Sequence, residues 1–319
     1  MQTGHPLARI LLPYDGSPSA RLAGLFAASL IQGLPGVCQQ ITLIHVTGGG
    51  YLARHLQNVD LRVTRLEKTE EWQRIREYAL EREIKPLLAS GQQLLQEAGV
   101  KVEVRTEIQE GKIGERILAA AAAGGYTAII MGRRGLSALK ELLLGSVTQY
   151  VLTHARGLTV FVVGQGYQDG TPSPLFPLLL PVDGSEPSMA AVAQAATLVR
   201  GWQPEPPQLQ LLHVVDLALL GQMLTQEAEG LVVEGHQALV KAREVLAAAG
   251  LQEAATEKLV SGIPAQVIAQ EAREHRCPLI FMGSRGYSPL SRLILGSVTH
   301  SVLHLATQPT IGVVYPPPA

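Results

Sequence analysis

The fold is decided by the stretch AIIMGRRGLSALKELLLGSVTQYVLTHA (residues 128–155), which returns as LIFMGSRGYSPLSRLILGSVTHSVLHLA (residues 279–306). Each copy begins with a short apolar run, continues into a glycine-rich segment and ends in a segment with helical periodicity. Two further stretches repeat. RILLPYDGSPSA (residues 9–20) matches LLLPVDGSEPSMA (residues 178–190), and TLIHV (residues 42–46) matches QLLHV (residues 210–214). The sequence therefore predicts one domain that occurs twice in the chain.

The spacing of matched residues supports this duplication. Asp15 and His45 are 30 positions apart, and so are Asp183 and His213. Only the segment between the second strand and the glycine-rich motif differs, and it is 17 residues longer in the first copy. We therefore predict a first domain at residues 1–165 with a charged helical insertion at about 51–98, a linker at 166–176 and a second domain at 177–319.

The composition excludes several classes of protein. With 46% apolar and 17% charged residues, the chain is too apolar to be disordered. A net charge of -1 and an aromatic content of 4% give no basis for nucleic-acid binding. The sequence contains neither a signal-peptide pattern nor an uninterrupted apolar run long enough for a membrane span, so we expect a cytoplasmic protein. Cys38 and Cys277 stand in no metal or redox spacing and are expected to be buried and inert.

Apolar runs alternate with helix-period segments throughout each copy. Runs that are apolar at nearly every position indicate strands buried on both faces, and their alternation with helices predicts a doubly wound parallel α/β sheet. In the first copy we expect strands at residues 9–14, 40–46, 100–107, 127–131 and 158–163, and helices that include residues 17–32 and 113–123.

The segment from residue 54 to residue 85 carries 8 basic and 7 acidic side chains with the two signs mixed. This pattern is typical of a long solvated helix held by ion pairs between residues i and i+4. The alternative is a lid or partner surface around Trp72 and Tyr78. Pro86 is expected to kink the helix or restart it.

A glycine motif carries the chemistry in each copy. Both motifs follow a predicted buried strand, at the edge where parallel α/β sheets bind ligands. Glycines there allow a phosphate to approach the backbone N–H groups, and the following helix dipole favours an anion. We expect Ser146 and Ser297 to be the N-caps of those helices, with Arg134 and Arg285 adding positive charge. The motifs are Gly132-Arg133-Arg134-Gly135, nine residues, Gly145-Ser146, and Gly283-Ser284-Arg285-Gly286, nine residues, Gly296-Ser297.

Two pairs of polar residues occupy equivalent strand ends. Asp15 and Asp183 either hold a ribose hydroxyl or a metal through water, or cap the following helix, and both interpretations stay open. His45 and His213 are more often structural hydrogen-bonding groups than catalytic ones at such a position. Because no nucleophile, base and acid occur in a hydrolase order, we assign no catalytic residue.

Both halves resemble the universal stress protein family in its tandem form, because they carry the strand ending in aspartate, the His-Val strand end and the full glycine motif. The resemblance covers nearly the whole chain outside the linker and the charged insertion. It implies a five-stranded parallel sheet of order 3-2-1-4-5 in each half. Pairing of the last strands, LTVFVV (residues 158–163) and PTIGVV (residues 309–314), would make an intramolecular pseudo-dimer with a pseudo-two-fold axis. A homodimer of the whole chain stays open.

The full glycine motif marks the ATP-binding branch of this family, which implies ATP, or AMP or ADP, with Mg²⁺ or Mn²⁺ as cofactors. Protein side chains alone are not expected to hold the metal, although Asp15 and Asp183 would reach it through the nucleotide. With Arg134 and Arg285 included, the residues expected at the two nucleotide sites are Asp15, Val46, Met131, Gly132, Arg134, Gly135, Gly145, Ser146 and Val147 in the first half, and Asp183, Val214, Met282, Gly283, Arg285, Gly286, Gly296, Ser297 and Val298 in the second.

The resemblance favours an ATP-binding stress-response or signalling protein that senses adenine nucleotide. Two alternatives stay open. One is slow ATP hydrolysis or autophosphorylation with Ser146 or Ser297 as the acceptor, and the other is a scaffold with vestigial sites. The first copy departs from the family by having Arg133 where serine is usual, and the insertion lies only in this copy. Occupancy of the two sites is therefore expected to differ.

Overall fold

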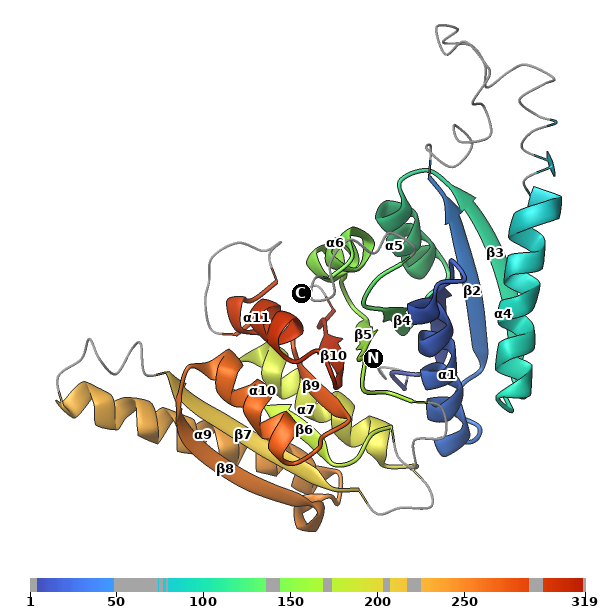
Figure 1. The fold of residues 1–319 in the computed structure, drawn as a ribbon. Helices are drawn as coiled ribbons and strands as arrows, with labels where there is room; N and C mark the ends of the chain where they lie inside the picture. Colours follow the sequence, from blue (N-terminus) through green and yellow to red (C-terminus); the bar gives the residue numbers. More distant parts are fainter. Residues whose placement is uncertain are drawn as a thin grey trace, which may run out of the picture.

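The computed structural model describes residues 5–48, 74, 77–78, 80–135, 144–168, 174–202, 207–216, 225–286 and 295–317, with residues 225–228 as backbone only. Strands and helices alternate along both halves, as the sequence predicts (Figure 1). The first half contains β1 (Arg9–Pro13), α1 (Pro18–Gly33), β2 (Gln40–Thr47), the π-helix η2 (Leu80–Ile84), α4 (Lys85–Glu97), β3 (Glu103–Glu110), α5 (Ile113–Ala123), β4 (Ala128–Gly132), α6 (Ser146–His154) and β5 (Thr159–Val163).

The second half repeats this succession of elements. It contains β6 (Leu178–Pro181), α7 (Glu186–Val199), β7 (Leu209–Asp216), α9 (Thr225–Ala248), the short 3-10 helix η3 (Gln252–Ala254), β8 (Ala255–Gly262), α10 (Pro264–Glu274), β9 (Leu279–Gly283), α11 (Ser297–Leu305) and β10 (Thr310–Val314).

The two halves share one ten-stranded sheet of order β3-β2-β1-β4-β5-β10-β9-β6-β7-β8. The predicted order 3-2-1-4-5 is therefore confirmed in each half, and the two five-stranded sheets are joined edge to edge. One core layer packs α1, α4, α7 and α9 on one face of the sheet, and the other packs α5, α6, α10 and α11 on the opposite face. On β1, for example, Ile10 and Leu12 belong to the first layer and Leu11 to the second, which explains the unbroken apolar run.

The halves meet through β5 and β10, which pair antiparallel, whereas the other pairs of neighbouring strands are parallel. Phe161 on β5 lies opposite Gly312 on β10. The Phe161 ring packs against Phe281 at 5.8 Å between centroids and against Phe26 at 6.0 Å. A Cβ at Gly312 would lie 2.2 Å from the Phe281 ring, so only glycine fits between these aromatic side chains. The predicted pairing of the last strands is thus present in this chain.

One strand lies away from its predicted place. β3 begins and ends three residues later than the predicted strand at 100–107. It is an edge strand that pairs with β2 alone, and most of its residues are exposed or half-buried. Its side chains therefore lack the apolar pattern that located the central strands.

Part of the predicted charged helix falls outside the described residues, including residues 51–73 with Trp72. In the described part, Tyr78 is exposed, and Lys85 pairs with Glu81 across one turn. The π-helix ends at Ile84 and α4 begins at Lys85 with Pro86 in its first turn, as predicted for a restarted helix.

The predicted linker is tied into the core at both of its described ends. Tyr167 is buried, its hydroxyl lies 2.6 Å from Ser29 Oγ, and it also donates to the Leu25 carbonyl at 3.1 Å. Phe176 is buried beside Trp202, with ring centroids 6.0 Å apart. Glycine and proline content indicated a break between domains but gave no sign of these buried aromatic contacts.

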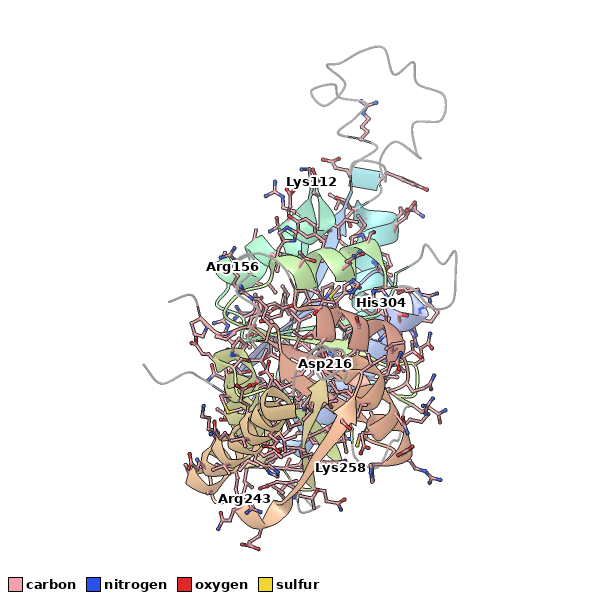
Figure 2. The ribbon with its side chains drawn as sticks, turned by 90° about the vertical axis from the view of Figure 1, so that its left-hand side faces the viewer. Lys112, Arg156, Asp216, Arg243, Lys258 and His304 are labelled. Atoms are coloured by element: carbon pink, nitrogen blue, oxygen red, sulfur yellow. The ribbon has the colours of Figure 1, made fainter. Side chains whose placement is uncertain are left out.

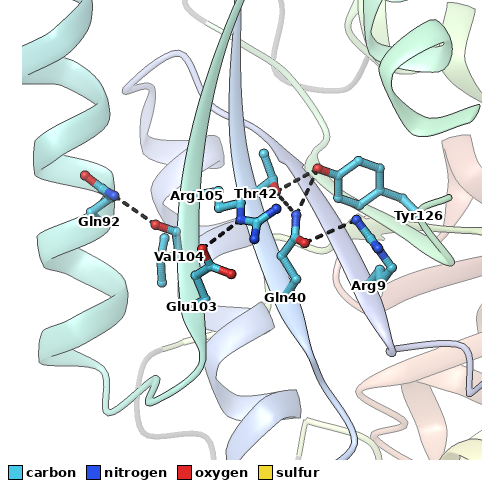
Figure 3. Close-up of polar contacts among 8 residues, drawn as sticks. All are labelled: Arg9, Gln40, Thr42, Gln92, Glu103, Val104, Arg105 and Tyr126. Atoms are coloured by element: carbon cyan, nitrogen blue, oxygen red, sulfur yellow. Dashed lines mark hydrogen bonds and ion pairs between the residues drawn. The ribbon is translucent and has the colours of Figure 1, made fainter. Parts of the chain in front are cut away.

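Polar networks occupy the amino ends of the strands, on the edge opposite the glycine motifs. In the first half, Arg9 donates to Gln40 at 3.1 Å, and Tyr126 donates to Thr42 at 2.7 Å (Figure 3). In the second half, Lys258 (labelled in Figure 2) donates to the buried Glu271 at 2.6 Å. These contacts satisfy buried polar groups and lie far from the candidate site.

Both cysteines are buried, as predicted. Burial raises the pKa of Cys38 to about 11. Burial and the nearby Glu271 charge raise the pKa of Cys277 to about 12. Among the helices that the structure describes, none combines the length and apolar character needed to cross a bilayer.

Replacing Gly312 by valine should lower the free energy of unfolding by about 1–3 kcal/mol, because its branched side chain overlaps the Phe281 ring. Chemical denaturation followed by circular dichroism measures this change. As a control, Gly230→Ala in α9 should raise the stability by about 0.5–1 kcal/mol, since nothing lies near the added methyl group. A Gly312→Val variant as stable as the wild type would contradict the packing described for the junction.

The raised pKa values predict slow thiol chemistry in the folded protein. At pH 8 the native thiols should react with an aromatic disulfide reagent at least about a hundredfold more slowly than in urea, because few are ionised and both are buried. Absorbance of the released thiolate measures both rates. Equal rates in the two conditions would show that these side chains are accessible.

Candidate functional site

A cavity of about 800 Å³ lies at the carboxyl ends of β6, β7 and β9, beside the first turn of α11. β6 and β9 are neighbours in the sheet. The next strand after β6, β7, lies on one side of this pair, and the next strand after β9, β10, lies on the other side, so the strand order reverses between them. Crevices at such a reversal are the usual ligand sites of open α/β sheets. The cavity wall includes every residue predicted for the second nucleotide site, namely Asp183, Val214, Met282, Gly283, Arg285, Gly286, Gly296, Ser297 and Val298.

The first half has the same arrangement at the ends of β1, β2 and β4. Val46 is buried near the end of β2, and Met131 and Gly132 are the buried last residues of β4. Arg134 and Gly135 follow that strand, Gly145 precedes α6, and Ser146 and Val147 begin it. Asp15 follows β1 and faces this glycine segment.

The two oxygens of each aspartate carboxylate have different neighbours. The Oδ1 atoms of Asp15 and Asp183 accept the backbone N–H of Ser17 and Ser185, each at 3.0 Å. Those serines, not the aspartates, cap α1 and α7. The Oδ2 atoms instead face the glycine motifs. One oxygen therefore supports the structural interpretation, and the other is placed for contact with a ligand.

The last glycine of each G-x-x-G motif has no space for a side chain. A Cβ at Gly135 would lie 2.4 Å from Asp15 Oδ2, and one at Gly286 would lie 2.3 Å from Asp183 Oδ2. Any larger residue would displace the carboxylate or the loop. The same close approach in both halves agrees with the requirement for a bare backbone that the sequence predicted.

The predicted capping role of Ser146 and Ser297 is wrong. Gly145 and Gly296 occupy the N-cap positions, and both serines are exposed first residues of their helices. The reason lies in the preceding glycine, whose N–H is held by a carbonyl of the G-x-x-G segment at 2.8 Å in the first half and 2.9 Å in the second. The glycine is therefore fixed in an extended conformation as the N-cap, and the helix starts one residue earlier than expected.

Two threonines that sequence reasoning missed tie these helices to the strand ends. Thr148 donates to the Gly132 carbonyl at 3.0 Å, and Thr299 donates to the Gly283 carbonyl at 2.9 Å. Both threonines are buried. The signal was present in the sequence as a repeated G-S-V-T, of which every residue except the threonine was assigned to the site.

The two strand-end histidines have a structural contact in common. Nδ1 of His45 lies 2.8 Å from the Tyr14 carbonyl oxygen, and Nδ1 of His213 lies 2.8 Å from that of Val182. Each ring therefore donates to the residue before the site aspartate and holds the first and second strands together. This geometry agrees with the structural interpretation of both residues.

Arg133 stands where the family pattern has serine, and its side chain crosses to the other half. It is buried, and its Nη2 donates to the Leu303 carbonyl near the end of α11. Burial and then the neighbouring Arg134 charge lower the pKa of Arg133 to about 10. Arg133 also influences His304, which is labelled in Figure 2. Burial and then the charges of His300 and Arg133 lower the pKa of His304.

The arrangement has the features needed to hold an anionic ligand with an apolar end. Strand ends and α10 supply apolar side chains, the glycines supply uncovered backbone, and Arg285 supplies positive charge. Within the described residues, no group of three or more His, Cys, Asp or Glu side chains is placed to hold a metal ion. A divalent cation near one of the aspartates would therefore need further ligands from a bound small molecule or from water.

Comparison with known proteins agrees with the fold and the repeat. The sequence profile of the universal stress protein family matches residues 7–163 and again residues 176–313. Universal stress protein YxiE of Bacillus subtilis is 34% identical over 149 residues, covering 42% of this chain and 95% of the relative. A universal stress protein of Mycolicibacterium smegmatis is 28% identical over 218 residues, covering 66% of this chain and 68% of the relative.

Similarity of structure extends over both halves at once. The crystal structure of a universal stress protein from Archaeoglobus fulgidus has a TM-score of 0.66 and 24% identity, covering 97% of this chain and 99% of that one. A match at this identity establishes the shared fold. Because the family profile covers both repeats, this chain belongs to the universal stress protein family, in its tandem two-domain form.

Proposed function

We propose that this chain binds ATP with Mg²⁺ or Mn²⁺ at two equivalent crevices, one in each half, and acts in a stress response as a sensor of adenine nucleotide. The observation that carries the proposal is the second-half cavity. One wall combines apolar strand ends, uncovered glycine backbone, an arginine and the first turn of a helix. That combination matches the base, the phosphates and the charge of a nucleotide.

The residues have distinct tasks in this proposal. Val214 and Met282 provide apolar contact for the base at the strand ends. Backbone N–H groups at Gly286 and Ser297 donate to the phosphates, helped by the dipole of α11. Bound Mg²⁺ would offset phosphate charge and would let the aspartate carboxylate interact with the phosphates through the metal. With the domain limits that we predict, 1–165 and 177–319, each unit would contain one such site.

Nucleotide-free protein should take up two equivalents of MgATP in isothermal titration calorimetry. Gly135→Val and Gly286→Val should each remove one equivalent, because the added side chain occupies the space beside the aspartate Oδ2. The affected site should lose affinity by about a hundredfold or more, which corresponds to about 2.7 kcal/mol.

The matched control is Gly230→Ala, which should leave both equivalents in place because an added Cβ there meets nothing within 4 Å and Gly230 does not line the cavity. If the double variant Gly135→Val, Gly286→Val bound MgATP as tightly as the wild type, the phosphate assignment would be wrong. If the wild type gave no heat and no thermal shift at millimolar MgATP, the proposed function itself would fail.

The autophosphorylation alternative is favoured by one observation, namely that the hydroxyls of Ser146 and Ser297 are exposed at helix N-termini instead of serving as caps. Our proposal of a sensor without turnover predicts an unchanged intact mass after incubation with MgATP. Addition of one phosphoryl group at either serine, lost in the corresponding Ser→Ala variant, would establish the alternative instead.

A further inference from the structure

The second-half cavity has a wall that comes from the first half. Besides residues of its own half, the cavity is lined by Gln149 and Thr153, which belong to α6. The same cavity wall includes Ser297 and Ser301 of α11. The sequence comparison treated each half as a complete unit and assigned no role to either α6 residue.

The antiparallel junction explains how α6 reaches this site. β5 and β10 run in opposite directions, so the helices that precede them, α6 and α11, also run in opposite directions on the same face of the sheet (Figure 1). The N-terminal turns of α11 therefore lie beside the C-terminal turns of α6. Two donors across the junction agree with this alignment, because Arg133 reaches the Leu303 carbonyl and Tyr315 reaches the Leu152 carbonyl.

The order of walls across the cavity indicates which end of a ligand meets α6. Leu212 and Val214 on β7 form the apolar end, and the strand order places β6 and β9 next and then β10 and β5. α6, which packs over the first-half strands, is thus at the opposite end from β7. A nucleotide with its base near Val214 would direct its phosphate chain past α11 towards α6.

Of the two α6 side chains, Gln149 is the one with a hydrogen-bond donor to offer. The Thr153 hydroxyl donates to the Gln149 backbone carbonyl at 2.8 Å, so its proton is already used within the helix. The Gln149 side chain is exposed and carries an amide NH₂ group. Resting on the function proposed above, we propose that Gln149 of the first half donates to the terminal phosphate of a nucleoside triphosphate in the second-half cavity.

The pseudo-two-fold relation makes the two sites chemically different at this position. Gln149 lies four residues after Gly145, and the residue four after Gly296 is His300. By this equivalence His300 of α11 would face the first site as Gln149 of α6 faces the second, and His300 also belongs to the wall of the second-half cavity.

The test is Gln149→Glu, which keeps the shape of the side chain and replaces the donor by a negative charge. It is made in the Gly135→Val protein, where only the second site remains, and ATP and AMP are titrated separately. Repulsion from the new carboxylate should weaken ATP by about tenfold or more, whereas AMP should change by less than about twofold. His154→Gln, on the same helix but outside the cavity wall, is the matched control and should change neither affinity.

The same substitution in the Gly286→Val protein tests whether the effect is local. Only the first site remains there. Gln149 stands near the start of the helix beside that site, as His300 does in the second half, so Gln149→Glu should weaken ATP less there than in the Gly135→Val protein. An equal loss in both backgrounds, an equal loss for ATP and AMP, or no loss at all would overturn the assignment of Gln149. Failure of the wild type to bind either nucleotide would instead reject the proposed function together with this inference.

Discussion

The antiparallel pairing of β5 with β10 is the constraint on which the rest of the structure depends. Four residue pairs join two parallel sheets into one and fix the relation between the halves. The pairing buries the Phe161 and Phe281 rings against each other, which requires glycine at position 312. Because paired strands run in opposite directions, the carboxyl edges of the two half-sheets lie at opposite ends of the joined sheet. The two glycine motifs therefore open at separate places, on opposite edges of the joined sheet.

The same junction shows what a tandem chain can do that two identical subunits cannot. The Leu152 and Leu303 carbonyls are equivalent in the repeat, yet they receive their hydrogen bonds from different residues, Tyr315 and Arg133. The residue equivalent to Arg133 is Ser284, whose side chain is too short to cross the junction, and its buried hydroxyl has no partner among the described residues. Each half has thus evolved its own donor for the same carbonyl position, which covalent fusion permits because the copies mutate separately.

The sequence predicted those parts of the fold and site that depend on local chain chemistry. The unbroken apolar runs located the central strands. The repeated glycine spacing identified second-site residues that the structure brings together in one cavity wall. Edge strand β3 was misplaced because its exposed side chains carry no apolar pattern. Ser146 was assigned the cap because serine is a good cap, but the hydrogen bond from the Gly145 N–H to the Arg133 carbonyl fixes the glycine there instead. Contacts across the junction, such as those of Arg133 and Gln149, were out of reach because they depend on how the two copies dock.

The near-zero net charge of the chain hides a local imbalance of charge at the junction between the halves. Arg133 is buried, and in the described part of the chain its charge is met by a backbone carbonyl and no carboxylate, while its Nη1 has no partner there. A buried cation without a counter-ion is costly, which is why burial lowers its pKa to about 10. Arg133 lies inside the first glycine motif, but its guanidinium crosses the junction and donates to the Leu303 carbonyl of the other half. The residue that departs from the family pattern therefore serves the junction between the two halves, where its charge has no counter-ion among the described residues.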